Sequence, residues 1–235
     1  TDLWPGETLR LRRGDWTLPI DEATTLATDR ARSPVREVVT SLAPPPGKPA
    51  RPLTPSGLPE PPPEGPAADA MRAAAVRGTL IHKLFERLPN LPPSDRRTVG
   101  ERWLAAQGAG AQAPAILAEV LAILEDPAHA ALFGPDALAE APVAGLVGDQ
   151  AIAGVVDRLL VEEAHVLIVD FKTGLKVPGS PAEVALPHRR QMAAYAAVLR
   201  RAFPDREVQA ALLYTAAPKF LLLAEKDMEG LLPLD

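Results

Sequence analysis

The chain contains no cysteine, and this absence excludes several kinds of site at once. Disulfides, thiolate zinc sites and cysteine-bound iron–sulfur clusters all need thiolate ligands, so none is expected. The sequence also lacks an apolar run of the roughly 18 residues that a membrane-spanning helix needs. Its first residues do not have the pattern of a secretory signal. We therefore expect a cytoplasmic protein with no membrane partner.

Aromatic residues and positive charge are also scarce. Aromatic residues make up 4% of the chain, so the core is expected to be aliphatic. The net charge is −5, whereas a protein that holds DNA by charge alone should be basic. A simple DNA-coating module is therefore excluded, while a site whose carboxylates hold cations is not. No Gly-x-x-x-x-Gly-Lys-Ser/Thr phosphate loop occurs, so no ATP site is expected in this chain.

Proline divides the chain into three parts. Eleven prolines fall within residues 42–66. Proline fixes φ and removes a backbone donor, so this stretch is predicted to be an extended linker. Residues 1–41 before it form an arm of mixed composition, to which the sequence assigns no role. Residues 67–235 after it are predicted to form one domain.

This domain begins with helical patterns and continues with strand patterns. Apolar residues spaced three and four apart predict a first helix that starts near Asp69 and stops at Pro89. Two more helices are predicted at 94–107 and 114–125. The later elements are strands at 142–147, 151–162 and 165–172, a loop at 175–187, a helix at 188–203, and strands at 207–214 and 219–224. This order predicts an α/β fold with a mixed central sheet flanked by helices.

Two carboxylates are expected to face each other in the hairpin of residues 151–172. If Glu163 and Ala164 form a two-residue turn, residues whose numbers sum to 327 are opposed, which places Asp157 opposite Asp170. Side chains so opposed have Cβ atoms about 5 Å apart. Two carboxylates at that distance repel, and a hard divalent cation such as Mg²⁺ or Mn²⁺ removes the repulsion. A one-residue slip in register would turn one of them to the other face.

Lys172 lies two residues after Asp170, so both side chains point to the same face of the strand. An ammonium group beside paired carboxylates can position a water or neutralise charge on a phosphate undergoing hydrolysis. The alternative is a polar sheet edge with a chance Asp-Phe-Lys. The apolar run from Val166 to Val169 favours the functional interpretation, because an Asp that ends a buried strand needs a reason.

His82 and a stripe on the last long helix complete the set of candidates. Gly78, His82 and Glu86 are four apart on the first helix, so the imidazole can reach a metal from a face that a ligand can approach. Gln191 and Tyr195 are also four apart, and such a pair can bind phosphate or hold a lysine. An ordinary solvated helix face explains the second pair equally well. Further residues of this helix are His188 and the candidate phosphate contacts Arg189, Arg190, Arg200 and Arg201.

Four segments in this order resemble the RecB-type branch of the PD-(D/E)xK nucleases. They are Arg77-Gly78-Thr79-Leu80-Ile81-His82, Gly154-Val155-Val156-Asp157-Arg158-Leu159, Ile168-Val169-Asp170-Phe171-Lys172-Thr173-Gly174 and Gln191-Met192-Ala193-Ala194-Tyr195. The resemblance covers about residues 70–224. The proline-rich run before the first segment and the lack of cysteine are most similar to the C-terminal nuclease domain of bacterial AddA-type helicase–nuclease subunits. AddB-like and Cas4-like relatives usually carry a cysteine-bound cluster.

The resemblance implies a restriction-endonuclease-like fold and a metal-dependent DNA nuclease. It implies a metal held by His82, Asp157, Asp170 and the backbone carbonyl of Phe171, with Lys172 catalytic. Gln191 and Tyr195 would support Lys172, and Glu140 is an additional family acid to which we give little weight.

The partners implied are DNA, helicase motor domains outside this chain and an AddB-like second subunit. The implied role is exonucleolytic processing of DNA ends during double-strand break repair. The alternative is a non-catalytic domain that keeps the fold and docks on DNA or on a partner. The presence of Lys172 and His82 favours the enzyme.

Overall fold

The structure is a computed structural model, and it describes Thr54 and residues 66–232. The predictions for the arm at 1–41 and for nearly all of the linker at 42–66 lie outside these residues. The first described helix begins at Pro66, the last residue of the predicted linker. Within the described range, no helix is long and apolar enough to cross a membrane.

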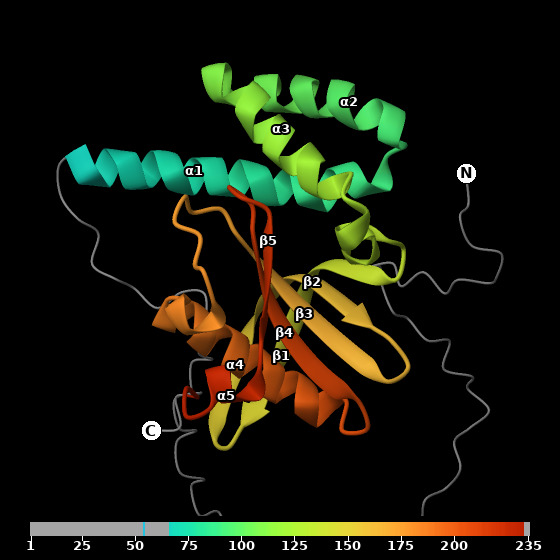
Figure 1. Cartoon of the computed structure of the whole chain (residues 1–235), viewed down its shortest axis with the longest axis vertical. Coiled ribbons are helices and arrows are strands. Elements are labelled where there is room, and N and C mark those ends of the chain that lie inside the picture. Colours follow the sequence, from blue (N-terminus) through green and yellow to red (C-terminus); the bar gives the residue numbers. More distant parts are fainter. Residues whose placement is uncertain (1–53, 55–65, 233–235) are drawn as a thin grey trace, which may run out of the picture. The chain divides into compact units, whose positions relative to one another are not determined.

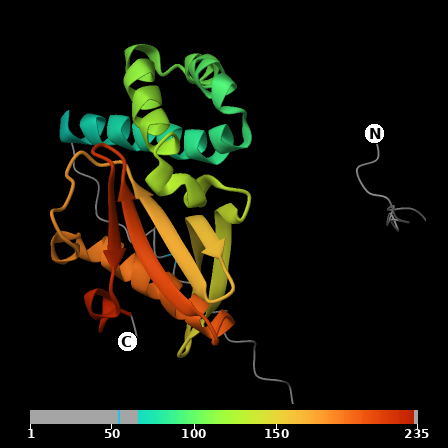
Figure 2. The same ribbon diagram turned by 45° about the vertical axis from the view of Figure 1, so that its right-hand side comes forward.

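The described domain is a five-stranded sheet with helices on both faces (Figures 1 and 2). The α-helices are α1 (Pro66–Arg87), α2 (Pro93–Ala106), α3 (Ala113–Leu124), α4 (Leu186–Ala202) and the short α5 (Glu225–Met228). The strands are β1 (Ala137–Val147), β2 (Gln150–Val161), β3 (His165–Lys172), β4 (Glu207–Tyr214) and β5 (Lys219–Leu223). Short 3₁₀ turns occur at Leu88–Asn90, Gly110–Gln112, Pro127–Phe133 and Pro181–Glu183.

The strands lie in the sheet in sequence order. Neighbouring strands are antiparallel except β3 and β4, which are parallel and are connected through α4. A parallel pair needs such a crossover, because its strands start at the same edge of the sheet. The mixed sheet confirms the predicted α/β, restriction-endonuclease-like fold class.

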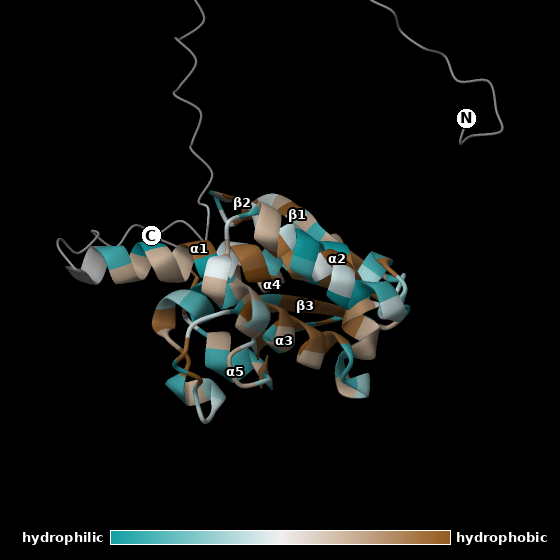
Figure 3. Cartoon of the chain, turned by 90° about the horizontal axis from the view of Figure 1, so that it is seen from above, coloured by the Kyte–Doolittle hydropathy of each residue, from teal (hydrophilic) through white to brown (hydrophobic). Residues whose placement is uncertain are grey.

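Two apolar cores lie on opposite faces of the sheet. The alternating side chains of β3 supply both: Val166 and Ile168 join the core under α4, whereas Val169 and Phe171 join the core under α1 and α3. A strand buried on both faces has no polar alternation. Figure 3 shows β3 accordingly as an apolar strand enclosed between the helices.

The element boundaries agree closely with the prediction except at β1. The predicted limits of β3 and β4 are those observed, and the other helices and strands shift by one to three residues. β1, however, begins at Ala137 and not at residue 142. Ala137, Leu138 and Ala139 lack a strand-like pattern, and they are extended because they pair with Leu160, Leu159 and Arg158 of β2.

The predicted register of the β2–β3 hairpin is correct. Arg158 pairs with Val169 and Leu159 pairs with Ile168, and both pairs sum to 327. The Glu162 amide donates to the His165 carbonyl at 2.8 Å, which closes the two-residue loop at residues 163–164.

The outer face of the β1–β2 hairpin is open to solvent and yet apolar. Three cross-strand pairs form it: Pro142 with Val155, Ala144 with Ala153, and Leu146 with Ala151. Leu146 is 58% exposed and Val155 is 46% exposed. The opposite face of the same hairpin contributes Val143, Val147, Ile152 and Val156 to the core under α4. This hairpin therefore has apolar side chains on both faces.

Candidate active site

The site lies where β2 and β3 stop pairing. Their backbone pairing reaches Arg158 with Val169, and the next donor along β3, the Phe171 amide, donates to Oδ2 of Asp157 at 2.5 Å. A carboxylate thus replaces a backbone acceptor at this point. Arg158, the residue after Asp157 on β2, connects this strand to α1. It donates to the Phe85 carbonyl, in the last turn of α1, where carbonyls have no partner within the helix.

α1 brings His82 to this point. Ile81, Leu84 and Phe85 bury the inner face of the helix in the core shared with α3, so the adjacent His82 is held at the boundary of that core. Its Nδ1 lies 2.8 Å from Oδ1 of Asp157, and its ring centroid lies 5.9 Å from that of Phe171. Burial opposes the charged imidazole, but the hydrogen bond to Asp157 and the nearby charges of Asp170 and Glu140 outweigh it and raise the pKa of His82.

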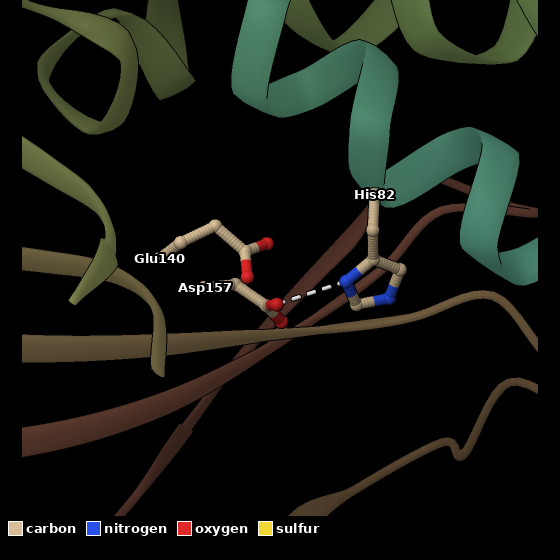
Figure 4. Close-up of side chains that lie close together, drawn as sticks. All are labelled: His82, Glu140 and Asp157. Atoms are coloured by element: carbon tan, nitrogen blue, oxygen red, sulfur yellow. Dashed lines mark hydrogen bonds and ion pairs between the residues drawn. The ribbon is translucent and has the colours of Figure 1, made fainter. Parts of the chain in front are cut away.

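Glu140 completes a group of three donors (Figure 4). One ligand atom from each of His82, Glu140 and Asp157 lies within 4.8 Å of the other two. On β1, Ala139 pairs with Arg158 and Ala141 pairs with Val156, so Glu140 stands opposite Asp157, where no pair forms. The backbone of Glu140 has φ of 48°, a left-handed conformation that is strained for a residue with a side chain.

A second network links β3 to α4. Nζ of Lys172 lies 2.7 Å from Oδ2 of Asp170 and donates to Oε1 of Gln191 at 2.9 Å. Nε2 of Gln191 donates to Oδ1 of Asp170 at 2.7 Å, which closes the triangle. The Lys172 side chain is only 15% exposed. It is retained by a buried carboxylate and a buried amide.

Asp170 is the most strongly buried carboxyl group of the site. Burial raises its pKa, and the charge of Asp157 acts in the same direction, while Lys172 and His82 oppose the shift. The carboxyl group is therefore a better proton acceptor than a free aspartate. The charges of Asp157 and His82 thus act on Asp170. Asp170 nevertheless does not belong to the group of three donors, and its role as a metal ligand stays a prediction.

The structure answers one question about α4 that the sequence left open. Gln191 and Tyr195 are 6% and 0% exposed, so the solvated-face interpretation is wrong for both. Tyr195 packs in the core under α4, and a side chain at Gly154 of β2 would overlap its hydroxyl. His188, three residues before Gln191, has its pKa lowered to about 4 by burial and by the charge of Lys172. It is therefore neutral at pH 7.

The other predicted residues have simpler surroundings. Of the four arginines on α4, Arg200 lies 3.9 Å from Glu225 of α5. The Nε atom of Arg189 is buried without a hydrogen-bond partner in the described part of the chain. The hydrogen bond between Phe171 and Asp157 involves the Phe171 amide, and the predicted role of the Phe171 carbonyl as a metal ligand stays a prediction.

The donor set of His82, Glu140 and Asp157 fits a divalent cation. Two carboxylates and one imidazole are ligands suited to Mg²⁺ or Mn²⁺. Glu140 and Asp157 repel each other when both are charged, and a cation between them would remove that repulsion. The sequence identified two of these three residues. Glu140 was undervalued, although its place opposite Asp157 follows from extending the β1–β2 pairing by one residue.

The chain is similar to known proteins in sequence and in structure. Residues 56–227 match the sequence profile of the PD-(D/E)XK nuclease superfamily. Among solved structures, the chain is similar to a "putative exonuclease" from Eubacterium rectale, with 10% identity and a TM-score of 0.46. The match covers 67% of this chain and 61% of that one. The structure of SSO0001 is similar at 15% identity with a TM-score of 0.31, over 68% of this chain and 83% of that one. No curated protein was found to match the chain.

Proposed function

Because the chain belongs to the PD-(D/E)XK nuclease superfamily, we propose that it is a divalent-metal-dependent deoxyribonuclease. The observation that supports an active enzyme is the Asp170–Lys172–Gln191 network beside the group of His82, Glu140 and Asp157. A docking domain would not need a charged lysine held by a buried carboxylate at this point. Both groups are present, and five elements contribute to them at the point where β2 and β3 stop pairing.

The residues divide the chemistry between them. A cation bound by His82, Glu140 and Asp157 would neutralise phosphate charge and favour a nucleophilic hydroxide. Lys172 would donate hydrogen bonds to the attacking water or to a non-bridging phosphate oxygen, and stabilise the charge that develops there. Asp170 and Gln191 hold its ammonium group in one place, so little reorganisation is needed during the reaction.

The finer role follows the resemblance found in the sequence. We propose exonucleolytic processing of DNA ends during double-strand break repair. In this role the domain would act beside helicase motor domains outside this chain and an AddB-like second subunit. The net charge of −5 supports such an arrangement, because a chain with net negative charge depends on other parts to hold the DNA.

The test is Lys172→Ala, with degradation of end-labelled linear DNA and calorimetric Mn²⁺ binding measured on each variant. Lys172 has no lone pair while protonated, so it is not a ligand, and Mn²⁺ affinity should be retained. Activity should fall by a factor on the order of 10² or more, as for the loss of one preorganised charge. Lys176→Ala, on the exposed loop after β3, is the matched control and should be as active as the wild type.

Two results would contradict the proposal. Near-normal degradation by Lys172→Ala would remove Lys172 from the mechanism. A wild-type protein that binds DNA but does not cut it with Mg²⁺ or Mn²⁺ would favour the docking module. A circular single-stranded substrate separates the modes of cleavage, because an exonuclease needs an end and should leave it intact.

A further inference from the structure

The guanidinium group of Arg77 connects three elements near the site. Arg77 lies on α1, five residues before His82. Its Nη1 donates to the carbonyl of Thr173 at 3.0 Å, and its Nη2 pairs with the carboxylate of Glu119 on α3. The two side chains are 23% and 12% exposed, so solvent screens this ion pair less than a surface pair. The residue therefore joins α1 and α3 to the chain that follows β3.

The carbonyl that Arg77 holds belongs to the residue directly after Lys172. β3 ends at Lys172, so the sheet provides no partner for the Thr173 carbonyl. The preceding carbonyl, that of Lys172 itself, accepts from the Thr215 amide at 3.0 Å, just beyond β4. The backbone around Lys172 is thus held at two successive carbonyls, one by the end of β4 and one by α1.

α1 approaches the Thr173 side chain closely at Gly78. A Cβ atom at Gly78 would lie 2.8 Å from Oγ1 of Thr173, so a side chain there would require the Thr173 side chain or the helix to shift. On the other side of Arg77, residues 69–76 of α1 are exposed. Within residues 69–87 of α1, Arg77 and Gly78 are the first from the N-terminal end that are not exposed, and they lie against Thr173 at the end of β3.

We infer that Arg77 is a positioning residue that fixes Lys172 relative to the helix carrying His82. The inference rests on the proposed function. It adds the contact that sets the distance between the Lys172 network and the group of three donors. α1 carries His82, and β3 carries Asp170 and Lys172. A rigid link between α1 and the end of β3 keeps the ammonium group of Lys172 at a fixed distance from the three donors. Only an arginine offers a planar fork that reaches a carbonyl and a carboxylate at once.

Arg77→Met in a Glu119→Gln background tests the inference without leaving a buried carboxylate unpaired. The double variant should fold, and its Mn²⁺ affinity and KM for linear DNA should equal those of the Glu119→Gln protein. Its kcat per folded molecule should fall on the order of 10-fold to 100-fold, as expected when a reacting group is misplaced. Arg77→Lys should recover only part of this loss. Arg72→Met is the matched control, because Arg72 pairs with Asp69 on the exposed part of α1, and it should change nothing.

A readout without activity comes from amide hydrogen exchange in the metal-free protein. Exchange in residues 172–176 should become faster in the Arg77 variant, while α3 and β4 remain protected. Normal kcat in the double variant would overturn the inference. A loss of kcat accompanied by faster exchange throughout the domain would show a merely structural role and would overturn it as well. If the wild type does not cut DNA, the proposed function fails, and exchange at 172–176 alone decides whether Arg77 fixes the strand end.

Discussion

A proton and a metal ion should compete for the imidazole of His82. The Asp157 hydrogen bond and nearby carboxylates raise its pKa despite burial. A histidine with a raised pKa in the folded protein stabilises it at low pH, and this contribution is lost as pH rises through the folded pKa. Metal binding needs the neutral imidazole. From pH 6.5 upward, the metal-free protein should therefore lose stability while Mn²⁺ affinity rises.

Thermal unfolding with and without Mn²⁺ across this pH range measures both trends. Mn²⁺ binding in buffers of different ionisation enthalpy should report proton release near the lower end of the range. His82→Asn should remove the contribution of this group to both. An Mn²⁺ affinity that does not change with pH in the wild type would show that His82 is not a ligand.

Asp170 and Asp157 should respond in opposite ways to loss of charge. Burial raises the pKa of Asp170, so its charged form destabilises the folded protein at pH 7. Asp170→Asn should therefore raise the unfolding temperature of the metal-free protein. Asp157 accepts from the Phe171 amide and contacts His82, and an amide offers only one accepting oxygen. Asp157→Asn should lower stability by about 1–3 kcal/mol. Both variants should lose nuclease activity, and destabilisation by both would contradict the expected role of burial at Asp170.

The sequence predicted the site residues that follow from strand periodicity and register. Asp170 and Lys172 share a face because they are two apart, and the turn at residues 163–164 fixed the register of Asp157. The position of Glu140 opposite Asp157 follows only once β1 is extended to residues before 142, and its left-handed backbone does not follow from residue type. Nor could the spacing of Gln191 and Tyr195 show which face of α4 is buried, since burial depends on the sheet beneath the helix.

Among the elements, α4 and the β1–β2 hairpin pack with unusually little space between them. A Cβ atom at Gly145 would lie 2.8 Å from Cγ1 of Val198, and one at Gly154 would overlap the hydroxyl of Tyr195. Gly154→Ala should therefore lower the free energy of unfolding by about 1–3 kcal/mol through overpacking. Chemical denaturation measures this, and Gly174→Ala is the control, because no atom lies within 4 Å of the Cβ position there. Equal stability of the two variants would contradict the close packing.

Element types were easier to predict than their limits. The helices have an apolar periodicity of their own, and β3 and β4 are continuous apolar runs, so their residues alone defined them. The first residues of β1 have no such pattern and become a strand through pairing with β2. Whether these residues are extended depends on the residues of β2, which lie outside any local sequence pattern.

For the whole molecule, the sequence predicts where a protease should act. The eleven prolines of residues 42–66 predict an extended segment, and the described domain begins with α1 at Pro66. Limited proteolysis should therefore cut within residues 42–66 and leave a stable product that starts near residue 67. Mass spectrometry of the product identifies the cut, and a fragment that keeps metal-dependent activity would show that 67–235 is sufficient. Resistance of the whole stretch would mean that it is packed against a neighbour.

The apolar outer face of the β1–β2 hairpin has a consequence for how the strands find their alignment. In most antiparallel pairs a one-residue slip buries polar side chains, and that penalty selects the correct alignment. Here Ala144, Leu146 and Val155 are no more polar than the residues they would replace, so polarity does not discriminate. Steric exclusion does, because a slip would bring a side chain to the places of Gly145 and Gly154 under α4. The alignment that sets Glu140 opposite Asp157 is thus selected by the steric fit between α4 and the hairpin, and not by the polarity of the hairpin's side chains.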